Sequence, residues 1–303
     1  MKIVSVVGGL GSQMMAFGLY LALKKAFPND QVILDFSGYS KYGRADHNGA
    51  ELHRLFGIEE QSAPSWVSYV MHGKSIVAKI LRVLLPLFGI LSIHRANHSA
   101  YNYDPGVFVE RPRVAYDQCW TSWKYFESVE HELRRALRFP LLSDSTNAQI
   151  ATSMKGQQSV AIHVRRGDYL QSPVLGGLVG RGYYEDAIHL IRTKINNPVF
   201  YIFSDDIEWC RNNLVHLLDQ EPMFIDWNHA SLSYIDMQLM SHCRHHIIPN
   251  SSFSWWGAYL AKHKEQIVIA PRLWVNPKSG LQMNDMNLPD WLIIDNSNAS
   301  LEI

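Results

Sequence analysis

The chain has 303 residues, and at roughly 150 residues per domain this length predicts two domains. Hydrophobic residues make up 47% of it and charged residues 18%, which excludes a disordered, collagen-like or coiled-coil protein. Lys and Arg number 28 and Asp and Glu also number 28, so the net charge is zero and general binding to nucleic acid is not expected.

The first elements of the chain predict a βαβ unit. Residues 3–7 form an apolar run typical of a strand, a glycine turn follows, and residues 13–26 have a helical pattern. Pro28 ends that helix, and residues 31–36 have the pattern of a second strand. Strand, tight turn, helix and strand in this order indicate an α/β fold with parallel strands.

The turn after the first strand contains Gly8, Gly9 and Gly11. Glycines let backbone amides approach a ligand closely and the helix N-terminus favours an anion, so these three are candidate binding positions. Their spacing does not fit the G-x-G-x-x-G fingerprint, but Asp35 near the end of the second strand leaves a nicotinamide-dependent oxidoreductase as an alternative. Because the same glycines interrupt the N-terminal apolar run, we expect no signal peptide.

The region from 50 to 150 is helical in pattern but does not divide clearly into elements. Within it, residues 76–93 are apolar, yet their charge-free part, 83–93, is shorter than the ~20 residues of a transmembrane helix. We expect a buried or interface helix. The alternative is peripheral membrane contact through 76–95, where cationic side chains would meet anionic lipid: Lys74, Lys79, Arg82 and Arg95.

Residues 142–158 are small and polar and predict a linker. We therefore expect one domain over 1–150 and a second over 151–303, with room for the extreme C-terminus to pack back on the first. The second half alternates strands with helices, which predicts a parallel, doubly wound sheet. The predicted strands are 159–164, 199–204, 223–225, 246–248 and 266–269, and the predicted helices are 183–194, one from about 206 capped by Ser204 or Asp205, 233–242 and 253–262.

One charged motif, with His163, Arg165, Arg166 and Asp168, stands at the carboxyl end of the predicted strand over 159–164. Ligand-binding groups gather at that edge of open α/β sheets. Two adjacent arginines cannot point the same way from an extended backbone, so we expect one to face a ligand and the other to pack or form an ion pair. An Arg fork suits phosphate oxygens; a surface ion pair is the alternative.

Two later segments add polar candidates. Asp236 lies early in its helix and could accept hydrogen bonds from a base or a ribose. Its alternative role is only to stabilise the helix, because a carboxylate interacts favourably with the dipole at a helix N-terminus. Asn250, Ser251 and Ser252 form a polar strand-to-helix turn, which predicts a phosphate cradle or a simple helix cap. The His- and Cys-rich run over 241–246 suggests a zinc site as an alternative, but no second cluster in the sequence has the spacing of metal ligands. Three scattered cysteines predict no disulfide framework and a reducing compartment.

Three motifs in this order make the chain similar to a known family. Gly-Gly-Leu-Gly-x-Gln begins at Gly8, His-Val-Arg-Arg-Gly-Asp-Tyr at His163 and Asn-Ser-Ser-Phe-Ser-Trp-Trp-Gly-Ala at Asn250. With Ser-Asp-Asp at 204–206 and the helix that contains Asp236, they resemble the bacterial α-1,2-fucosyltransferases of glycosyltransferase family eleven. The resemblance covers most of the chain.

This resemblance implies a GT-B type of α/β fold, in which two Rossmann-like domains face a cleft, the first on the acceptor side and the second binding GDP-fucose. It implies inverting, metal-independent transfer of L-fucose to the 2-hydroxyl of a terminal β-galactoside, for a surface glycan or O-antigen. It also implies a cytoplasmic enzyme, with a peripheral place at the inner membrane as an option, and neither a cofactor nor a nucleic-acid partner. The implied donor contacts are Gly8, Gly9, Gly11, His163, Arg165 at the β-phosphate, Asp205, Asp236, Asn250, Ser251, Ser252 and Phe253.

The chemistry of this transfer can be argued from the residues. As the bond to the diphosphate breaks, the leaving group gains negative charge, which Arg165, helix N-termini and hydroxyls can stabilise without a divalent ion. The attacking hydroxyl loses its proton to a base, for which Asp168 is the candidate; its alternative role is to orient Arg165 or Arg166.

Two other hypotheses stay open beside this one: a non-catalytic protein that binds a glycan or nucleotide sugar, and the nicotinamide-dependent oxidoreductase. We expect Trp255 and Trp256 to pack beneath the polar turn rather than to touch sugar. The unranked candidates for acceptor contacts are His47, Asn48, Trp66, Asp104 and Trp120.

Overall fold

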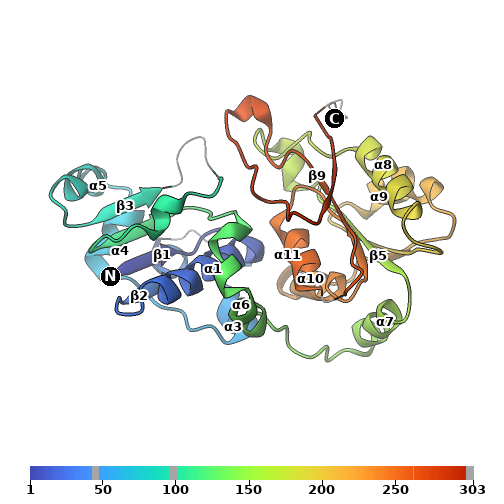
Figure 1. Cartoon of the computed structure of the whole chain (residues 1–303), viewed down its shortest axis with the longest axis horizontal. Helices are drawn as coiled ribbons and strands as arrows, with labels where there is room; N and C mark the ends of the chain where they lie inside the picture. The colour runs from blue at the N-terminus through green and yellow to red at the C-terminus, as the bar shows by residue number, and fades with distance from the viewer. Residues whose placement is uncertain (43–47, 96–100, 262, 298–303) are drawn as a thin grey trace. The chain divides into compact units, whose positions relative to one another are not determined.

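The computed structural model describes residues 1–42, 48–95, 101–261 and 263–297. The chain divides into two compact units, Met1–Pro140 and Leu141–Ile303 (Figure 1). The boundary thus falls at 140 rather than at the predicted 150, because much of the expected linker is helix α7, Ser145–Lys155. Asp144 caps this helix by accepting the N–H of Asn147, and the helix packs into the core of the second unit.

In the described residues, the first unit contains a four-stranded parallel sheet in the order β2-β1-β4-β3. The predicted βαβ unit is confirmed, since β1 and β2 pair in parallel and helix α1 connects them in the sequence. The strands are β1 Lys2–Ser5, β2 Val32–Asp35, β3 Ser92–Arg95 and β4 Val114–Asp117. The helices are α1 Leu10–Ala26, α2 Ser37–Tyr42, α3 Leu52–Phe56, α4 Ser65–His72, α5 Ile76–Leu87 and α6 Glu130–Ala136.

Apolar side chains hold the first sheet between helices. Ile3, Ile33 and Ala115, from three adjacent strands, pack with Val67 and Met71 of α4 in one buried cluster. Helix α1 lies along β1 and β2 and buries most of its own length. Strands β3 and β4, which the sequence did not predict, complete the sheet within the region that reads as helical.

The second unit contains, among the described residues, a six-stranded parallel sheet in the order β10-β9-β8-β5-β6-β7. This confirms the predicted doubly wound sheet, with one strand more than predicted. Its strands are β5 Ser159–Val164, β6 Val199–Ser204, β7 Met223–Ile225, β8 His245–Ile247, β9 Val268–Pro271 and β10 Leu292–Ile294. Besides α7, its helices are α8 Arg181–Arg192, α9 Ile207–Leu214, α10 Tyr234–Met240 and α11 Ser252–Leu260.

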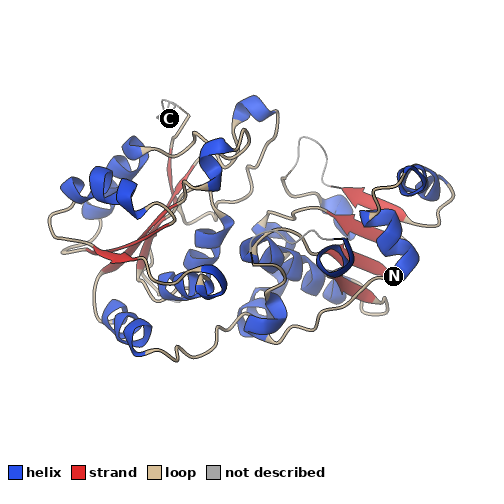
Figure 2. Cartoon of the chain, turned by 180° about the vertical axis from the view of Figure 1, so that it is seen from behind, coloured by secondary structure: helices blue, strands red, loops and turns tan. Residues whose placement is uncertain are grey.

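Successive residues of the central strands face two separate helix layers, as the period of two in a strand requires. Val160 and Ile162 of β5 pack with Tyr184 and other residues of α8 and α9. The intervening Ala161 packs with Leu239 and its neighbours from α7 and α10. Figure 2 shows helices on both sides of this sheet. Because β5 pairs with β6 on one side and β8 on the other, the carboxyl ends of these three strands lie next to one another.

The apolar run over 76–93 forms α5 and leads into β3. Of the two expectations for this segment, a buried or an interface helix, the buried one is wrong, because in α5 only Ala78 is buried and most of the apolar side chains face outward. In the described part of the chain, no helix is both long enough and apolar enough to span a membrane.

Candidate functional site

Arg165 lies immediately after β5 and is held by two carboxylates. Its Nη2 is 2.7 Å from Oδ1 of Asp168 and its Nη1 is 3.0 Å from Oδ2 of Asp205, which follows β6. Asp205 lies close to Gly167, where a Cβ would be 2.8 Å from Oδ2 of Asp205 and would displace the carboxylate. The structure therefore brings Arg165, Asp168 and Asp205 together at the adjacent ends of β5 and β6.

Arg166 points to a different set of partners, which confirms that the two arginines diverge. Its Nε is 3.1 Å from Oδ2 of Asp206, and its guanidinium lies 4.5 Å from the ring centre of Trp209. Its backbone N–H donates to Oδ1 of Asp205 at 2.8 Å. Asp206, rather than the predicted Ser204 or Asp205, caps α9 by accepting the N–H of Trp209. Arg166 thus fixes the ends of β5 and β6.

This corner is not a concentration of positive charge, because the two guanidiniums face three carboxylates. Arg165 still keeps capacity for a ligand. A guanidinium has five N–H donors, and the two ion pairs use two of them. Its side chain is 28% exposed, against 15% for Arg166. Of the two arginines, Arg165 is the one that can face an anionic ligand.

The polar turn between β8 and α11 lies beside this corner. The side-chain nitrogen of Asn250 donates to the carbonyls of Leu175 and Trp274 at 3.0 and 3.2 Å, so it fixes the turn. The hydroxyl of Tyr169 donates to the Asn250 carbonyl at 3.3 Å and ties the loop after β5 to the turn. Sequence reasoning gave Tyr169 no role, although the residue stands within the charged motif.

Helix α11 begins at Ser252, directly after the buried Ser251. The first amides of a helix have no acceptor within it and favour an anion, so the N-terminus of α11 adds donors beside Arg165. Ser251 stands at the N-cap position, but its side chain accepts no hydrogen bond from the first amides of the helix. The alternative of a simple side-chain cap is therefore wrong for Ser251. Trp255 and Trp256 are fully buried, which confirms that they pack beneath the turn.

His163 is the last but one residue of β5 and is 6% exposed. Burial and the neighbouring positive charge of Arg165 lower the pKa of His163 to about 3, so the ring is neutral at physiological pH. Its ring centre lies 5.8 Å from that of Phe253 in the first turn of α11. Its Nδ1 is buried and has no hydrogen-bond partner among the described residues, so the ring can serve a ligand as a neutral hydrogen-bonding group.

Asp236 lies in the first turn of α10, where its Oδ1 accepts a hydrogen bond from Nδ2 of Asn228 at 2.8 Å. Asn228 in turn is paired with Asn147 of α7. Burial of the carboxyl raises the pKa of Asp236 from 3.8 to about 7. A carboxyl with this pKa can change its charge near neutral pH, which a simple helix-dipole role does not need.

The raised pKa gives a stability test. The pKa of Asp236 is about 3.8 in the unfolded chain and about 7 in the folded chain. The stabilisation from its protonated carboxyl is therefore complete below about pH 4 and is lost as the pH rises to about 7. We expect Asp236→Asn, which cannot ionise, to gain stability over the parent protein across this window, by roughly 4 kcal/mol at most. Thermal melting of both proteins from pH 4 to pH 8 measures the difference; a constant difference would contradict the raised pKa.

In the first unit, the glycine turn is held by its own surroundings. Gly8 has a φ of +76°, and its carbonyl accepts hydrogen bonds from Nε2 of Gln13 and the hydroxyl of Tyr39. Gly9 caps α1, and Gly11 is buried inside the helix. Gly11 is the second residue of α1, so its amide belongs to the first turn of the helix, and Gly8 and Gly9 lie at the carboxyl end of β1.

The oxidoreductase alternative rested on Asp35, and the structure contradicts that role. Asp35 is fully buried and accepts hydrogen bonds from His72, from Ala63 and from both the backbone and the hydroxyl of Ser37. Although burial opposes ionisation, these bonds hold the pKa of Asp35 below its ordinary value. A carboxylate occupied in this way cannot bind a ribose.

The histidine run after α10 is also used within the fold. His245 accepts the N–H of Ile267 at Nδ1 and bonds Gln158 through Nε2. His246 bonds the Met240 carbonyl through Nε2 and Gln266 through Nδ1. No group of side chains with the composition of a metal site occurs among the described residues. The three cysteines, all described, are free thiols.

The acceptor candidates have different surroundings. His47 lies outside the described residues. The side chain of Arg95, named above as a possible lipid contact, is likewise outside them. Asn48 and Trp66 are exposed, whereas Trp120 is 1% exposed and packs in the core, so it cannot offer a ring face to a sugar. Asp104 is also accessible, with a side chain that is 40% exposed.

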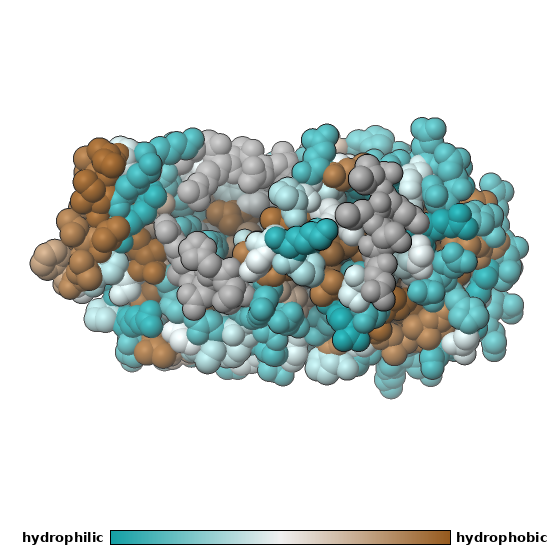
Figure 3. Space-filling view, turned by 90° about the horizontal axis from the view of Figure 1, so that it is seen from above, coloured by the Kyte–Doolittle hydropathy of each residue, from teal (hydrophilic) through white to brown (hydrophobic). Residues whose placement is uncertain are grey.

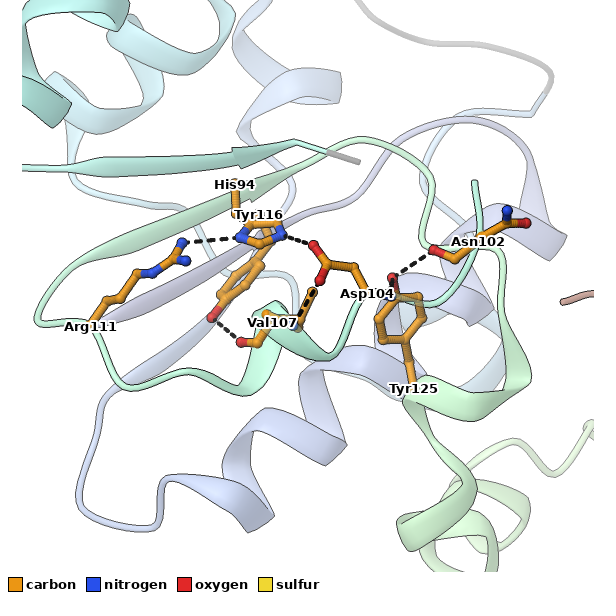
Figure 4. Close-up of polar contacts among 8 residues, drawn as sticks. His94, Asn102, Asp104, Val107, Arg111, Tyr116 and Tyr125 are labelled. Atoms are coloured by element: carbon orange, nitrogen blue, oxygen red, sulfur yellow. Dashed lines mark hydrogen bonds and ion pairs between the residues drawn. The ribbon is translucent and has the colours of Figure 1, made fainter. Parts of the chain in front are cut away.

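Asp104 belongs to a polar cluster near the carboxyl end of β3 that sequence reasoning missed (Figure 4). Arg111 donates from Nη1 to Nδ1 of His94 at 3.1 Å, so the ring proton of a neutral His94 lies on Nε2, which donates to Oδ2 of Asp104 at 2.8 Å. Oδ1 of Asp104 accepts the N–H of Gly106, and the hydroxyl of Tyr125 accepts the N–H of Asp104. The carboxylate is therefore fixed in position yet reachable from solvent.

These features define a class of protein: an α/β chain of two parallel-sheet units, whose second sheet presents an arginine and a helix N-terminus at its carboxyl edge for an anionic ligand. The family model described as glycosyl transferase family 11 matches residues 94–295. The chain belongs to this family, which confirms the resemblance seen in its motifs, and it is a glycosyltransferase.

Individual relatives extend the match over most of the chain. It is 31% identical over 278 residues to the Alpha-1,2-colitosyltransferase of Escherichia coli, covering 90% of this chain and 91% of that protein. It is 28% identical over 301 residues to the O-antigen biosynthesis glycosyltransferase WbnK of Escherichia coli, covering 91% and 96%. It is 27% identical over 238 residues to the Galactoside 2-alpha-L-fucosyltransferase SEC1 of Bos taurus, covering 72% and 62%.

Proposed function

We propose that the protein transfers L-fucose from GDP-fucose to the 2-hydroxyl of a terminal β-galactoside, with inversion at the anomeric carbon. Membership of family 11 and the names of the relatives support the reaction class. The observation that carries the proposal is Arg165, which is fixed at the carboxyl end of β5 beside the N-terminus of α11. The second unit is then the donor domain and the first the acceptor domain.

The donor's diphosphate would bind between Arg165 and the amides at the start of α11. As the bond between C1 of fucose and the diphosphate breaks, negative charge grows on the β-phosphate, and these donors stabilise it in place. Ser251 and Ser252 can add hydroxyl donors, and the neutral His163 and Phe253 lie behind them. Asp236 would accept a hydrogen bond from the guanosine part of the donor.

We propose that the reaction needs no divalent ion. Asp205 accepts hydrogen bonds from Arg165 and from the amide of Arg166, and Asp206 from Arg166 and the amide of Trp209. Both carboxylates that stand in sequence where a metal motif would be expected are thus occupied by cations and amides. Arg165 supplies the positive charge, so EDTA should leave turnover unchanged.

Asp168 would act as the base once the donor is bound. It is 52% exposed and holds Arg165 through a single ion pair, whereas Asp205 is fixed at both oxygens. A diphosphate that binds Arg165 would therefore displace Asp168 first. The freed carboxylate could then take the proton of the attacking galactose hydroxyl, which leaves inverted fucoside and GDP.

Two variants of Asp168 separate this role from simple orientation of Arg165. Asp168→Asn keeps an oxygen that can accept from Arg165 but cannot take a proton. We expect it to be as impaired as Asp168→Ala, with kcat lowered by about 10²-fold or more. Affinity for GDP, measured by calorimetry, should not fall in either variant, because the competing carboxylate is replaced by a neutral amide in one and removed in the other. Near-normal turnover by Asp168→Asn would restrict Asp168 to orienting Arg165.

On the acceptor side, we propose that Asp104 binds a hydroxyl of the galactoside, held in place by His94. Asp104→Asn should raise the KM for the acceptor about tenfold, as expected for a charged hydrogen bond of ~1.5 kcal/mol or more, and leave the KM for GDP-fucose unchanged. Initial-rate kinetics with each substrate varied in turn provide the test. Equal changes in both constants would show a structural role instead.

The central experiment incubates the purified chain with GDP-fucose and lactose or Galβ1-3GalNAc, with and without EDTA. We expect release of GDP and a product whose NMR spectrum shows an α-1,2-linked fucose. Absence of any product with these and a wider set of galactosides, together with retained GDP-fucose binding, would favour the alternative of a non-catalytic nucleotide-sugar-binding protein.

One observation favours a second donor. A relative with 31% identity is named for colitose, a sugar that differs from fucose by lacking the 3-hydroxyl. Parallel assays with GDP-fucose and GDP-colitose decide between the two, since the preferred donor has the higher kcat/KM. The name of the second relative supports a place in surface polysaccharide synthesis, such as O-antigen. We propose that the enzyme acts there from the cytoplasm.

A further inference from the structure

Helix α5 carries a continuous apolar surface on its outward side, which we call the α5 outer face. Ile76, Leu87 and Phe88 are 70%, 75% and 73% exposed. The whole face consists of Ile76, Val77, Ile80, Val83, Leu84, Leu87 and Phe88. Figure 3 shows a hydrophobic cluster with hydrophilic residues beside it at the left end of the view, the end where Figure 1 places α5. Monomeric soluble proteins rarely expose apolar patches of this extent without a partner.

The opposite side of α5 is fixed to the first unit. Ala78 is buried, and Leu81 and Leu85 pack against the cluster formed by the sheet and α4. Ser75 caps the helix by accepting the N–H of Ala78, and Nε of Arg82 donates to the Val70 carbonyl at 2.5 Å. The outer face is therefore held outward by a structured element rather than by a loose segment.

The segment of chain that contains α5 carries charge of one sign. No Asp or Glu occurs anywhere from residue 61 to residue 103, although the chain as a whole has as many acidic as basic residues. Lys74 and Lys79 are exposed, and Lys79 lies on the edge of the outer face at helical spacing. Apolar side chains bordered by cations and free of acidic residues are complementary to a surface of anionic lipid head groups.

We propose that the α5 outer face docks the enzyme on an anionic lipid bilayer. Leu87, Phe88 and their apolar neighbours would enter the boundary between head groups and acyl chains, while Lys74 and Lys79 would contact phosphates. A helix of 12 residues is about 18 Å long, short of the ~30 Å hydrocarbon core, so it would lie on the membrane plane. This proposal adds a place of action and does not depend on which sugar is transferred.

A second copy of the chain fits this surface less well. A two-fold symmetric pair would place the same face, with its Lys74 and Lys79, on both partners. No acidic side chain from residues 61–103 could neutralise them. A lipid surface supplies the missing negative charge, so the observations favour it.

Vesicle flotation with the full-length protein tests the proposal. The probes are vesicles of phosphatidylcholine alone and vesicles in which a third of the lipid is phosphatidylglycerol, without donor or acceptor. We expect binding to the anionic vesicles, weaker at about 1 M salt than at about 0.1 M. The variant with Leu87→Glu and Phe88→Glu should bind at least about tenfold more weakly. Lys74→Glu with Lys79→Glu should lose the preference for anionic lipid.

A matched control and an independent readout complete the test. Leu141→Glu changes a leucine that is 96% exposed in the other unit and should bind vesicles as the parent protein does. Turnover of a water-soluble acceptor by the α5 variants shows that they are folded, and GDP binding serves if the reaction differs from the proposed one. Equal flotation of the parent protein and the α5 variants would overturn the proposal. A second contradicting outcome is a parent protein that does not bind vesicles but is a dimer by light scattering, while the α5 variants are monomers.

Discussion

Replacing Arg165 with Ala is expected to lower kcat/KM by about 10²-fold or more, which corresponds to ~3 kcal/mol of lost transition-state stabilisation. Arg165 is the guanidinium that stays partly exposed at the corner between β5 and β6, with N–H donors left beyond its two ion pairs. The negative charge on the leaving diphosphate grows during the reaction. The loss should therefore fall mainly on kcat, with a smaller effect on the affinity for GDP-fucose.

The change also leaves Asp168 and Asp205 without their common cation, so a matched control is needed. Arg211 is an exposed arginine of the same unit, on α9, with its partner Asp226 at 3.9 Å. Arg211→Ala should keep near-normal kinetics. Steady-state rates with GDP-fucose and a galactoside provide the comparison, and near-normal kcat/KM for Arg165→Ala would remove Arg165 from the leaving-group role.

The second large effect is on stability, at Trp255. Its ring stacks on Tyr259 at 4.8 Å, lies edge-on to Trp256 at 5.0 Å, and donates from Nε1 to the Met286 carbonyl at 2.7 Å. Truncation to Ala would leave a cavity and an unpaired carbonyl beneath α11. We expect a loss of roughly 3–5 kcal/mol, and a fall in Tm on the order of 10 °C.

Two comparisons identify the cause of this loss. Trp255→Phe keeps most of the ring contacts and loses only the indole N–H, so it should be much less destabilised. Trp66→Ala removes a ring that is 44% exposed in the first unit and should change the stability by less than about 1 kcal/mol. Thermal melting of the three variants gives the order; equal losses for Trp255→Ala and Trp66→Ala would contradict the buried role of Trp255.

The second sheet could be predicted closely because its strands are apolar on both faces and end in clear turns. The bounds of β5, β6 and β7 agree with the predicted strands. In the first unit, strands β3 and β4 could not be predicted in the same way. Strands β3 and β4 have four residues each, and β3 contains His94 where an apolar residue would have marked a strand.

The composition of the donor site was predictable, but its electrostatics were not. Parallel strands bring Arg165 and Asp205 together whenever their strands are neighbours, and sequence alone does not give the strand order. The pairing with Asp168 and Asp205, which offsets the charge of Arg165, depends on side-chain directions that the sequence does not give. The cluster around Asp104 combines His94 of β3 with residues from separate later segments, and it carries no local motif.

A crystal structure of the complex with GDP tests the central claim most directly. We predict that oxygens of the β-phosphate lie about 2.7–2.9 Å from the guanidinium of Arg165, within hydrogen-bond distance of the first amides of α11, and that Asp168 has left Arg165. A diphosphate bound elsewhere, with Arg165 still held by both Asp168 and Asp205, would contradict the account.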